Sequence, residues 1–302
     1  MNSKHVKQFG GFGDIVLMFV IYVILIFFAL VILLPLINVL ASSFSSPSAV
    51  ISGRVGLWPV EFNVRGYQAV LSNTLITTGF RNSLFYSVGG TFMNLSLTLL
   101  VAYPLSREGL YGKKFFIGIY AVTMFIGGGM VPNYLLMRSL GLLDTWMVMV
   151  IPSGAAVGQV IIARTFMRTS IHGDLYGAAE VDGCSEFRIF FQIVLPLTKP
   201  MIAVFILMFA VGHWNSFFGG LMYLRSDSLF PLQLVLRRIL VMNEIDVTKM
   251  DVTMFENAME RMHFADLIKY ATIVVTMVPV MLLYPFIQKH FVKGIMIGSI
   301  KG

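Results

Sequence analysis

The stretch IVLMFVIYVILIFFALVILL, residues 15–34, decides the fold class because it runs for twenty residues without a charge or a glycine. A helix rises about 1.5 Å per residue, so some twenty apolar residues cross the hydrocarbon core of a bilayer. The stretch does not alternate between apolar and polar residues, as a strand of a membrane barrel would. Lys4 and Lys7 precede it as in a secretory signal, but the apolar core of a signal has only about 7 to 15 residues. We therefore expect a retained membrane anchor.

Composition extends this expectation to the whole chain. Of its 302 residues, 57% are hydrophobic and 12% are charged, against about 25% charged in an average soluble domain. With 26 Phe and 20 Met, a water-soluble fold would expose more apolar surface than such proteins tolerate. The net charge of +7 fits Lys and Arg retained on the cytoplasmic side of a membrane, so no nucleic-acid partner is expected. Cys184 is the single cysteine, which excludes an intramolecular disulfide.

Charged residues cluster and leave long uncharged gaps, which predict an all-α integral membrane protein with six transmembrane helices. We find no tandem repeat, so residues 1–302 are expected to form a single transmembrane domain. A coupling loop at 166–199 and an outer loop at 225–268 complete the expected organisation. The spans are expected at approximately 15–40, 83–106, 115–137, 145–165, 200–223 and 269–289.

The distribution of charge predicts the orientation. With the N-terminus inside, the inner segments carry a net charge of +6 and the outer segments +1. Short loops are the most reliable guide: Arg107, Lys113 and Lys114 crowd the connection after the second span, whereas the next connection has only Arg138. Both termini and the 166–199 loop are therefore predicted to be cytoplasmic.

At membrane depth, away from the span ends, the spans hold no Asp, Glu, Lys or Arg that would couple transport to an ion. His213 is the only titratable residue in a span apart from tyrosines, and a lone histidine is more often structural. No phosphate-binding loop G-x-x-x-x-G-K-[ST] is present, so any ATP must come from a partner. Ser153 with His213 is the only pair that suggests an intramembrane hydrolase, and no nucleophile elbow surrounds it. We expect no catalytic residue and no metal site.

The segment DLYGAAEVDGCSEFRIFFQIVLPLTKP, residues 174–200, is the informative part of the inner side. We expect a short helix in which Asp174 accepts N–H bonds from the first turn, with Gly183 ending the turn in a left-handed conformation. A second short helix is expected over 185–194, and Pro196 and Pro200 set the entry to the fifth span. A surface helix with a flat alanine face suits insertion into a groove of another protein.

This segment resembles the coupling motif of ABC importer permeases, which reads E-A-A, then D-G, and ends in I-x-L-P. The resemblance implies a cytoplasmic coupling helix, between spans 4 and 5, that docks into an ATP-hydrolysing subunit. Gly177 stands where the family has Glu, and Glu180, one turn later, is a candidate substitute. The matching residues are Ala178, Ala179, Asp182, Gly183, Ile193, Leu195 and Pro196.

Two more stretches, VGHWNSFFGGLMYL (211–224) and YPFIQKHFVKGIMIGSIKG (284–302), resemble the carbohydrate-importer branch of this family. They are similar to the inner permease subunit of maltose-type systems, and the whole is closest to oligosaccharide permeases of polysaccharide-degrading bacteria. Trp214 and Asn215 fit either a substrate path or an interfacial anchor. The resemblance implies a tail that reaches between ATPase subunits, although a frayed terminus is the alternative; the tail residues concerned are Gly294, Gly298, Lys301 and Gly302.

The resemblance thus implies a non-catalytic, multi-pass permease subunit of an ATP-driven sugar importer in a bacterial cell membrane. The implied partners are a second homologous permease in a heterodimer, two ATP-binding subunits that hold ATP and Mg, an extracytoplasmic solute-binding protein and membrane lipid. No cofactor is expected in this chain. The alternatives are a stand-alone secondary carrier or channel, or an intramembrane hydrolase. The sequence does not specify the sugar.

Overall fold

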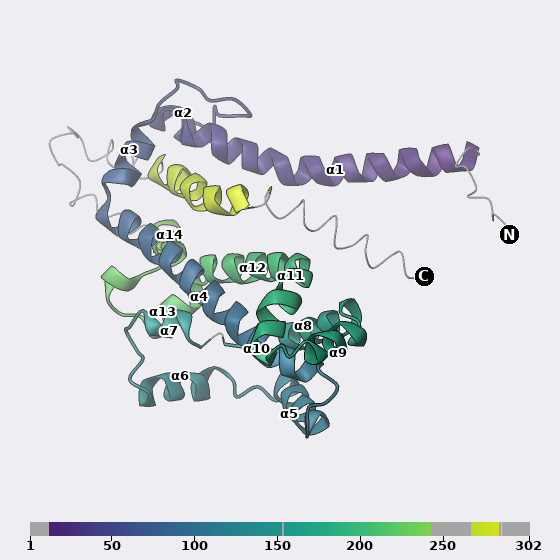
Figure 1. The fold of residues 1–302 in the computed structure, drawn as a ribbon. Coiled ribbons are helices and arrows are strands. Elements are labelled where there is room, and N and C mark those ends of the chain that lie inside the picture. Colours follow the sequence, from purple (N-terminus) through teal and green to yellow (C-terminus); the bar gives the residue numbers. More distant parts are fainter. Residues whose placement is uncertain (1–11, 153, 243–266, 284, 286–302) are drawn as a thin grey trace. The chain divides into compact units, whose positions relative to one another are not determined.

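The computed structural model describes residues 12–152, 154–242, 267–283 and 285, and every regular element in these ranges is a helix (Figure 1). The expected all-α class is confirmed. The chain divides into two compact units, one made of residues 1–70 with 247–274 and the other of 71–246 with 275–302. The single domain expected from the sequence stays a prediction.

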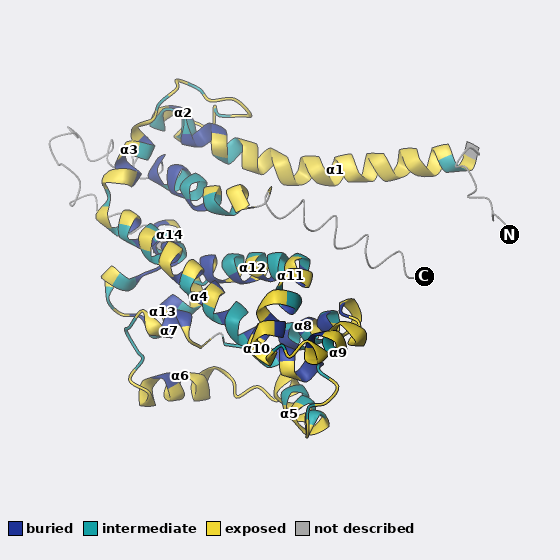
Figure 2. Cartoon of the chain, viewed as in Figure 1, coloured by how far each residue is buried: buried dark blue, intermediate teal, exposed yellow. Residues whose placement is uncertain are grey.

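Two helices are continuous and apolar enough to cross a membrane: α1 (Phe12–Ser43) and α4 (Thr74–Ser106). Figure 2 shows α1 exposed along most of its length, as expected of a helix that lipid covers. α4 begins before the expected start at 83, because the side chain of Asn73 accepts hydrogen bonds from the N–H groups of Leu75 (2.9 Å) and Ile76 (3.3 Å).

The expected third span, 115–137, is wrong as a single helix. It comprises α5 (Lys113–Phe125) and α6 (Met130–Ser139), which meet at an angle of 114°. Three consecutive glycines, 127–129, lie at the break, and Gly129 has a φ of +79°. Glycine weakens a helix interior without lowering hydropathy much, so a count of apolar residues does not register the bend.

The later spans are also interrupted. The range 145–165 holds α7 (Met147–Val150) and most of α8 (Val157–Ser170), with Pro152 and Gly154 in the break. The range 200–223 divides at Asn215, and the range 269–289 is described as a helix only to residue 283. The described helices supply two candidate spans, or up to four if each bent pair is one span. The remaining elements are α2 (Pro47–Ile51), α3 (Arg65–Ser72), α8 (Val157–Ser170), α9 (Gly173–Val181), α10 (Glu186–Ile189), the π-helix η1 (Phe190–Val194), α11 (Leu195–Leu197), α12 (Lys199–Trp214), α13 (Phe217–Tyr223), η2 (Asp227–Leu229), α14 (Leu232–Met242) and the helix Leu267–Leu283.

In the first unit, polar contacts fix the C-terminal end of α1. The amide of Asn38 donates to the carbonyls of Val55 (3.1 Å) and Gly56 (2.9 Å). Farther along, the hydroxyls of Ser43 and Tyr67 lie 2.7 Å apart and connect α1 to α3. These hydrogen bonds lie near the C-terminal end of α1, and the apolar length before them is left for lipid.

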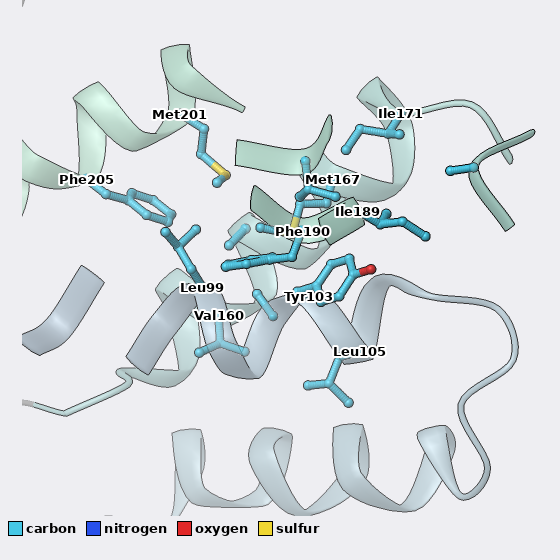
Figure 3. Close-up of a cluster of buried hydrophobic side chains, with 14 of the residues drawn as sticks. Leu99, Tyr103, Leu105, Val160, Met167, Ile171, Ile189, Phe190, Met201 and Phe205 are labelled. Atoms are coloured by element: carbon cyan, nitrogen blue, oxygen red, sulfur yellow. The ribbon is translucent and has the colours of Figure 1, made fainter. Parts of the chain in front are cut away.

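In the second unit, α4 is the central helix and packs against α8, α12 and α14. A cluster of buried apolar side chains, called the lower core below and drawn in Figure 3, joins the C-terminal half of α4 to α8, α10, η1 and α12. Each large apolar side chain buried there contributes about 1.5–3 kcal/mol relative to exposure. The labelled members are Leu99, Tyr103, Leu105, Val160, Met167, Ile171, Ile189, Phe190, Met201 and Phe205.

The other half of α4 holds the start of the 225–268 segment through hydrogen bonds. Asn82 donates to the Ser228 carbonyl (2.8 Å), and Tyr86 donates to the Leu229 carbonyl (2.9 Å). The N–H of Leu232, at the first residue of α14, donates to Ser83 Oγ (2.8 Å). Residues 227–232 therefore lie along α4, while residues 243–266 fall outside the described part.

α12 meets α4 through a buried histidine. The amide of Asn94 and Nε2 of His213 are hydrogen-bonded at 3.2 Å, and His213 also makes a backbone hydrogen bond to Met149. The imidazole ring lies directly over Gly90, where an added Cβ would be 2.3 Å from the ring atoms. Only glycine at residue 90 permits this close approach of the two helices.

Replacing Gly90 with Ala should therefore lower the stability of the protein by about 1–3 kcal/mol, because the ring cannot move without losing its hydrogen bonds. Gly89→Ala is the matched control, since its Cβ would meet Val150 at an ordinary 3.8 Å. Thermal unfolding in mild detergent should show a lower midpoint for Gly90→Ala only. Equal midpoints for the two variants would contradict the seating of His213 on Gly90.

Candidate functional site

The candidate site is the segment 173–197, which begins with α9. As predicted, Gly183 takes a left-handed conformation after the helix, with a φ of +71°. The N–H of Cys184 then donates to the Ala179 carbonyl (2.9 Å), which closes the turn. The prediction for Asp174 is wrong in detail, because α9 starts at Gly173 after His172 and no side chain caps it. Asp174 lies within the first turn, where a carboxylate favours the helix dipole.

The expected second helix is present, but half of it is a π-helix. Ser185 Oγ accepts the N–H of Arg188 (3.4 Å) at the start of α10. η1 then carries the chain to α11, which contains Leu195 and Pro196. The axis of Glu186–Leu197 meets that of α12 at 80°. The residues of the I-x-L-P ending thus lie at the corner between the surface segment and the fifth expected span.

This segment has one buried face and one exposed apolar face. Ala179 on α9 and Ile189 on α10 are at most 5% exposed and pack into the lower core. On the outside, Val181 is 89% exposed, Phe187 75% and Phe191 60%. Large apolar side chains in such a cluster mark an interaction surface rather than an ordinary water-facing one.

An ionic network ties the segment to the end of α4. Arg107, the residue after α4, donates to Glu180 of α9 and to Glu186 of α10, the latter at 3.1 Å. Its guanidinium carbon lies 4.0 Å from the centre of the Tyr176 ring. The hydroxyl of Tyr103 donates to the second oxygen of Glu186. One cation therefore connects three helices.

The electrostatic environment keeps Arg107 charged. Burial of the guanidinium opposes the charge, but hydrogen bonds and charge attraction from Glu180 and Glu186 outweigh burial and raise the pKa of Arg107. Burial likewise raises the pKa of the Tyr176 hydroxyl, so the phenol stays neutral at physiological pH. Arg107 therefore stays a cation beside a neutral Tyr176 near neutral pH.

The structure gives Glu180 a role within the chain. Glu180 was a candidate to replace the glutamate that the family has at position 177, but its carboxylate contacts Arg107. Gly177 has nothing within 4 Å of a Cβ placed on it, and it lines a hollow of about 770 Å³ between the ends of α4, α8 and α9. The missing side chain at 177 therefore leaves open space beside the network.

The other predicted residues lie elsewhere. Trp214 is buried, and its indole N–H donates to the Thr276 carbonyl (3.0 Å), so it anchors the last helix. Asn215 is exposed and accepts a hydrogen bond from Gln233 (3.2 Å). Ser153, suggested as a partner of His213, lies outside the described residues. So do the tail residues Gly294, Gly298, Lys301 and Gly302.

The chain matches, over residues 6–297, the family described as "Binding-protein-dependent transport system inner membrane component". It belongs to this family. The resemblance seen in the coupling segment is confirmed: the chain is an inner-membrane permease component of an ABC transport system that depends on a binding protein.

Related proteins cover nearly the whole chain. It is 38% identical over 282 residues to the polygalacturonan/rhamnogalacturonan transport system permease protein YtcP of Bacillus subtilis (strain 168), covering 93% of this chain and 97% of that protein. It is 27% identical to the arabinooligosaccharides transport system permease protein AraQ of Halalkalibacterium halodurans, covering 91% and 94%. A solved bacterial ABC transporter involved in the import of the acidic polysaccharide alginate matches with a TM-score of 0.84 and 31% identity, over 94% of this chain and 100% of that one.

The Arg107 network makes a prediction about Cys184, which is partly buried against the lower core. Arg107→Gln removes the cation between two carboxylates, so α9 and α10 should separate from α4 more often. The carboxylates are half exposed, so we expect a loss of about 1 kcal/mol and a roughly fivefold faster reaction of Cys184 with a thiol reagent in detergent. Arg188→Gln is the control, because the guanidinium of Arg188 donates to the Gln192 amide (3.1 Å) and to no carboxylate among the described residues. Equal labelling rates would show that the network does not hold the segment.

Proposed function

We propose that this chain is one of two permease subunits of an ATP-driven oligosaccharide importer, and that α9 is its docking element for an ATP-hydrolysing subunit. The observation that carries the proposal is the two-faced segment 173–197. Its inner face is fixed to α4 by the core and by Arg107, while Val181, Phe187 and Phe191 are exposed. An apolar surface on a rigidly held helix suits a partner that must transmit force.

The geometry supports a route for that force. Closure of a pair of ATPase subunits would displace α9, and Arg107 together with the buried Ile189 would carry the displacement to α4. The 80° corner after α11 would carry it to α12. The spans would then rock between inward-facing and outward-facing states. ATP and Mg would be held by the partner subunits, and this chain would perform no chemistry.

The proposed arrangement in the membrane has six spans with both termini in the cytoplasm. The concentration of basic residues at the inner segments supports this orientation. Each bent pair can count as one span, which brings the described helices to four spans.

The proposed substrate is an oligosaccharide delivered by an extracytoplasmic binding protein, with a second, homologous permease completing a heterodimer. The names of the related permeases refer to polygalacturonan, rhamnogalacturonan and arabinooligosaccharides, and the matching solved transporter is involved in the import of alginate. These names support a saccharide substrate without selecting one.

Affinity purification in mild detergent, with mass spectrometry of the recovered partners, tests the proposed assembly. We expect an ATP-hydrolysing subunit, a second permease and a solute-binding protein. Reconstituted vesicles should then take up an oligosaccharide only when ATP is supplied on the coupling-helix side. Uptake by this chain alone, without nucleotide, would contradict the proposal and favour a secondary carrier.

The coupling role predicts opposite outcomes for two glycines. Gly183→Val places a β-branched residue at a φ of +71°, which costs about 1–2 kcal/mol and should distort the end of α9. We expect uptake to be lost, with weaker recovery of the ATPase or uncoupled hydrolysis. Gly177→Ala is the control, because it has ordinary helical geometry and open space. Normal uptake by Gly183→Val would contradict the coupling assignment.

The single cysteine tests the orientation. In intact cells, a membrane-impermeant maleimide should leave Cys184 unlabelled, and opening the membrane should allow labelling. Cys184→Ala gives the background. Ready labelling of Cys184 from outside would reverse the proposed topology.

A further inference from the structure

A row of buried polar side chains on α4 carries oxygen atoms that have no hydrogen-bond partner in the described structure. Ser87, Thr91, Asn94 and Thr98 are spaced by four, three and four residues, so they lie on one face of the helix. Each is less than 9% exposed. None of Ser87 Oγ, Thr91 Oγ1, Asn94 Oδ1 and Thr98 Oγ1 makes a hydrogen bond to another described residue. The row lies within the second expected span.

Such a row is costly unless something satisfies it. A buried polar atom without a hydrogen bond costs about 1–3 kcal/mol. Helical hydroxyls usually avoid this cost by donating to a carbonyl one turn back, as Ser45 does to Ala41 and Thr198 does to Val194, both within 2.8 Å. The hydroxyls of the α4 row do not, so their hydrogen-bonding capacity is unused among the described residues.

A cavity lies beside this row. Its volume is about 350 Å³, which falls in the range of about 300–1,000 Å³ typical of ligand pockets. Asn94, whose Oδ1 is unpartnered, is the member of the row that lines it, and the rest of the lining comes from the α7 region, α12 and α13. At about 30 Å³ per molecule, roughly ten waters would fill it. Its other polar or aromatic lining residues are Phe209, His213, Ser216 and Tyr223.

The lining is mostly apolar, but it carries four polar side chains and no charged one among the described residues. Asn94, His213, Ser216 and Tyr223 offer hydrogen bonds, and Phe209 offers an aromatic surface. No Asp, Glu, Lys or Arg occurs among the described residues of the lining. A carboxylate would find no opposite charge there, and burying an unpaired charge is far more costly than burying a hydroxyl. The chemistry therefore fits neutral hydroxyl groups.

We propose that this cavity is a hydrated subsite that hydrogen-bonds neutral hydroxyls of the saccharide during transport. That the ligand is a saccharide rests on the proposed function, whereas the presence of water in the cavity does not depend on that function. Trp214 and Asn215, singled out by their sequence, flank the subsite without lining it, and their neighbours His213 and Ser216 line it. This permease then does not select saccharides by their carboxylates, so any such selection lies in the partner permease or the binding protein.

Cysteine accessibility tests the hydration. In a Cys184→Ala background, Asn94→Cys places a thiol in the cavity, and Phe92→Cys places one on the exposed apolar face of α4, where Phe92 is 72% exposed. In the assembled complex, a small hydrophilic methanethiosulfonate should modify the Asn94→Cys variant at least about tenfold faster than the Phe92→Cys variant, because thiolates form in contact with water. A slower or equal rate for the Asn94→Cys variant would mean a dry, packed interior and would overturn the proposal.

Uptake tests the ligand. Ser216 precedes α13 as its N-cap, where Asp is well tolerated, so Ser216→Asp adds a negative charge at the cavity. In reconstituted complexes, this variant should raise the ratio of uptake of fully methyl-esterified to unesterified oligogalacturonides of equal length by at least about tenfold. Ser216→Asn is the neutral control and should leave the ratio unchanged.

An unchanged ratio in Ser216→Asp would overturn the subsite, since a passing carboxylate would not have met the new charge. If the wild-type complex imports no oligosaccharide with ATP, whether neutral or acidic, the saccharide assignment under the proposed function fails. The accessibility of Asn94→Cys still decides whether the cavity is hydrated, so the two failures are distinguishable.

Discussion

The contact between the C-terminal end of α4 and the α9–α10 segment connects the long apolar helix α4 to an exposed apolar surface. Arg107 lies between the carboxylates of Glu180 and Glu186, and Ile189 is buried in the core beside them. Apolar burial gives this junction its stability, and the single cation gives it a defined geometry. A segment held this way moves with α4 rather than independently of it, which a coupling element requires.

The structure also depends on the close approach of α4 and α12, where the imidazole ring of His213 lies over Gly90. Those two helices leave a neutral polar interior, because the histidine, Asn94 and the row of hydroxyls supply hydrogen bonds without charge. A pathway for neutral polyols needs such groups and needs no ion-coupling residue. The absence of charged residues from the expected spans, noted from the sequence, agrees with an energy source outside the chain.

Sequence reasoning identified the elements whose signals are local. Apolar length identified α1 and α4, and the pattern D-G identified the left-handed turn at Gly183. It missed the bend between α5 and α6 because hydropathy does not measure helical continuity. It also missed the pairing of Arg107 with Glu180 and of Asn94 with His213, which join residues 73 and 119 positions apart. Only the fold brings such residues together, although the periodic polar residues of α4 were a visible signal.

The most direct test of the account is a photo-crosslink from the exposed end of α9. A benzoylphenylalanine in place of Val181, which is 89% exposed, should capture an ATP-hydrolysing subunit in the intact complex. The same probe in place of Trp58, 82% exposed in the first unit, should not capture it. Capture of the ATPase at 181 alone is the predicted result. Failure to capture it at 181, with capture of the extracytoplasmic binding protein or of lipid instead, would contradict the assignment of α9 as the coupling helix.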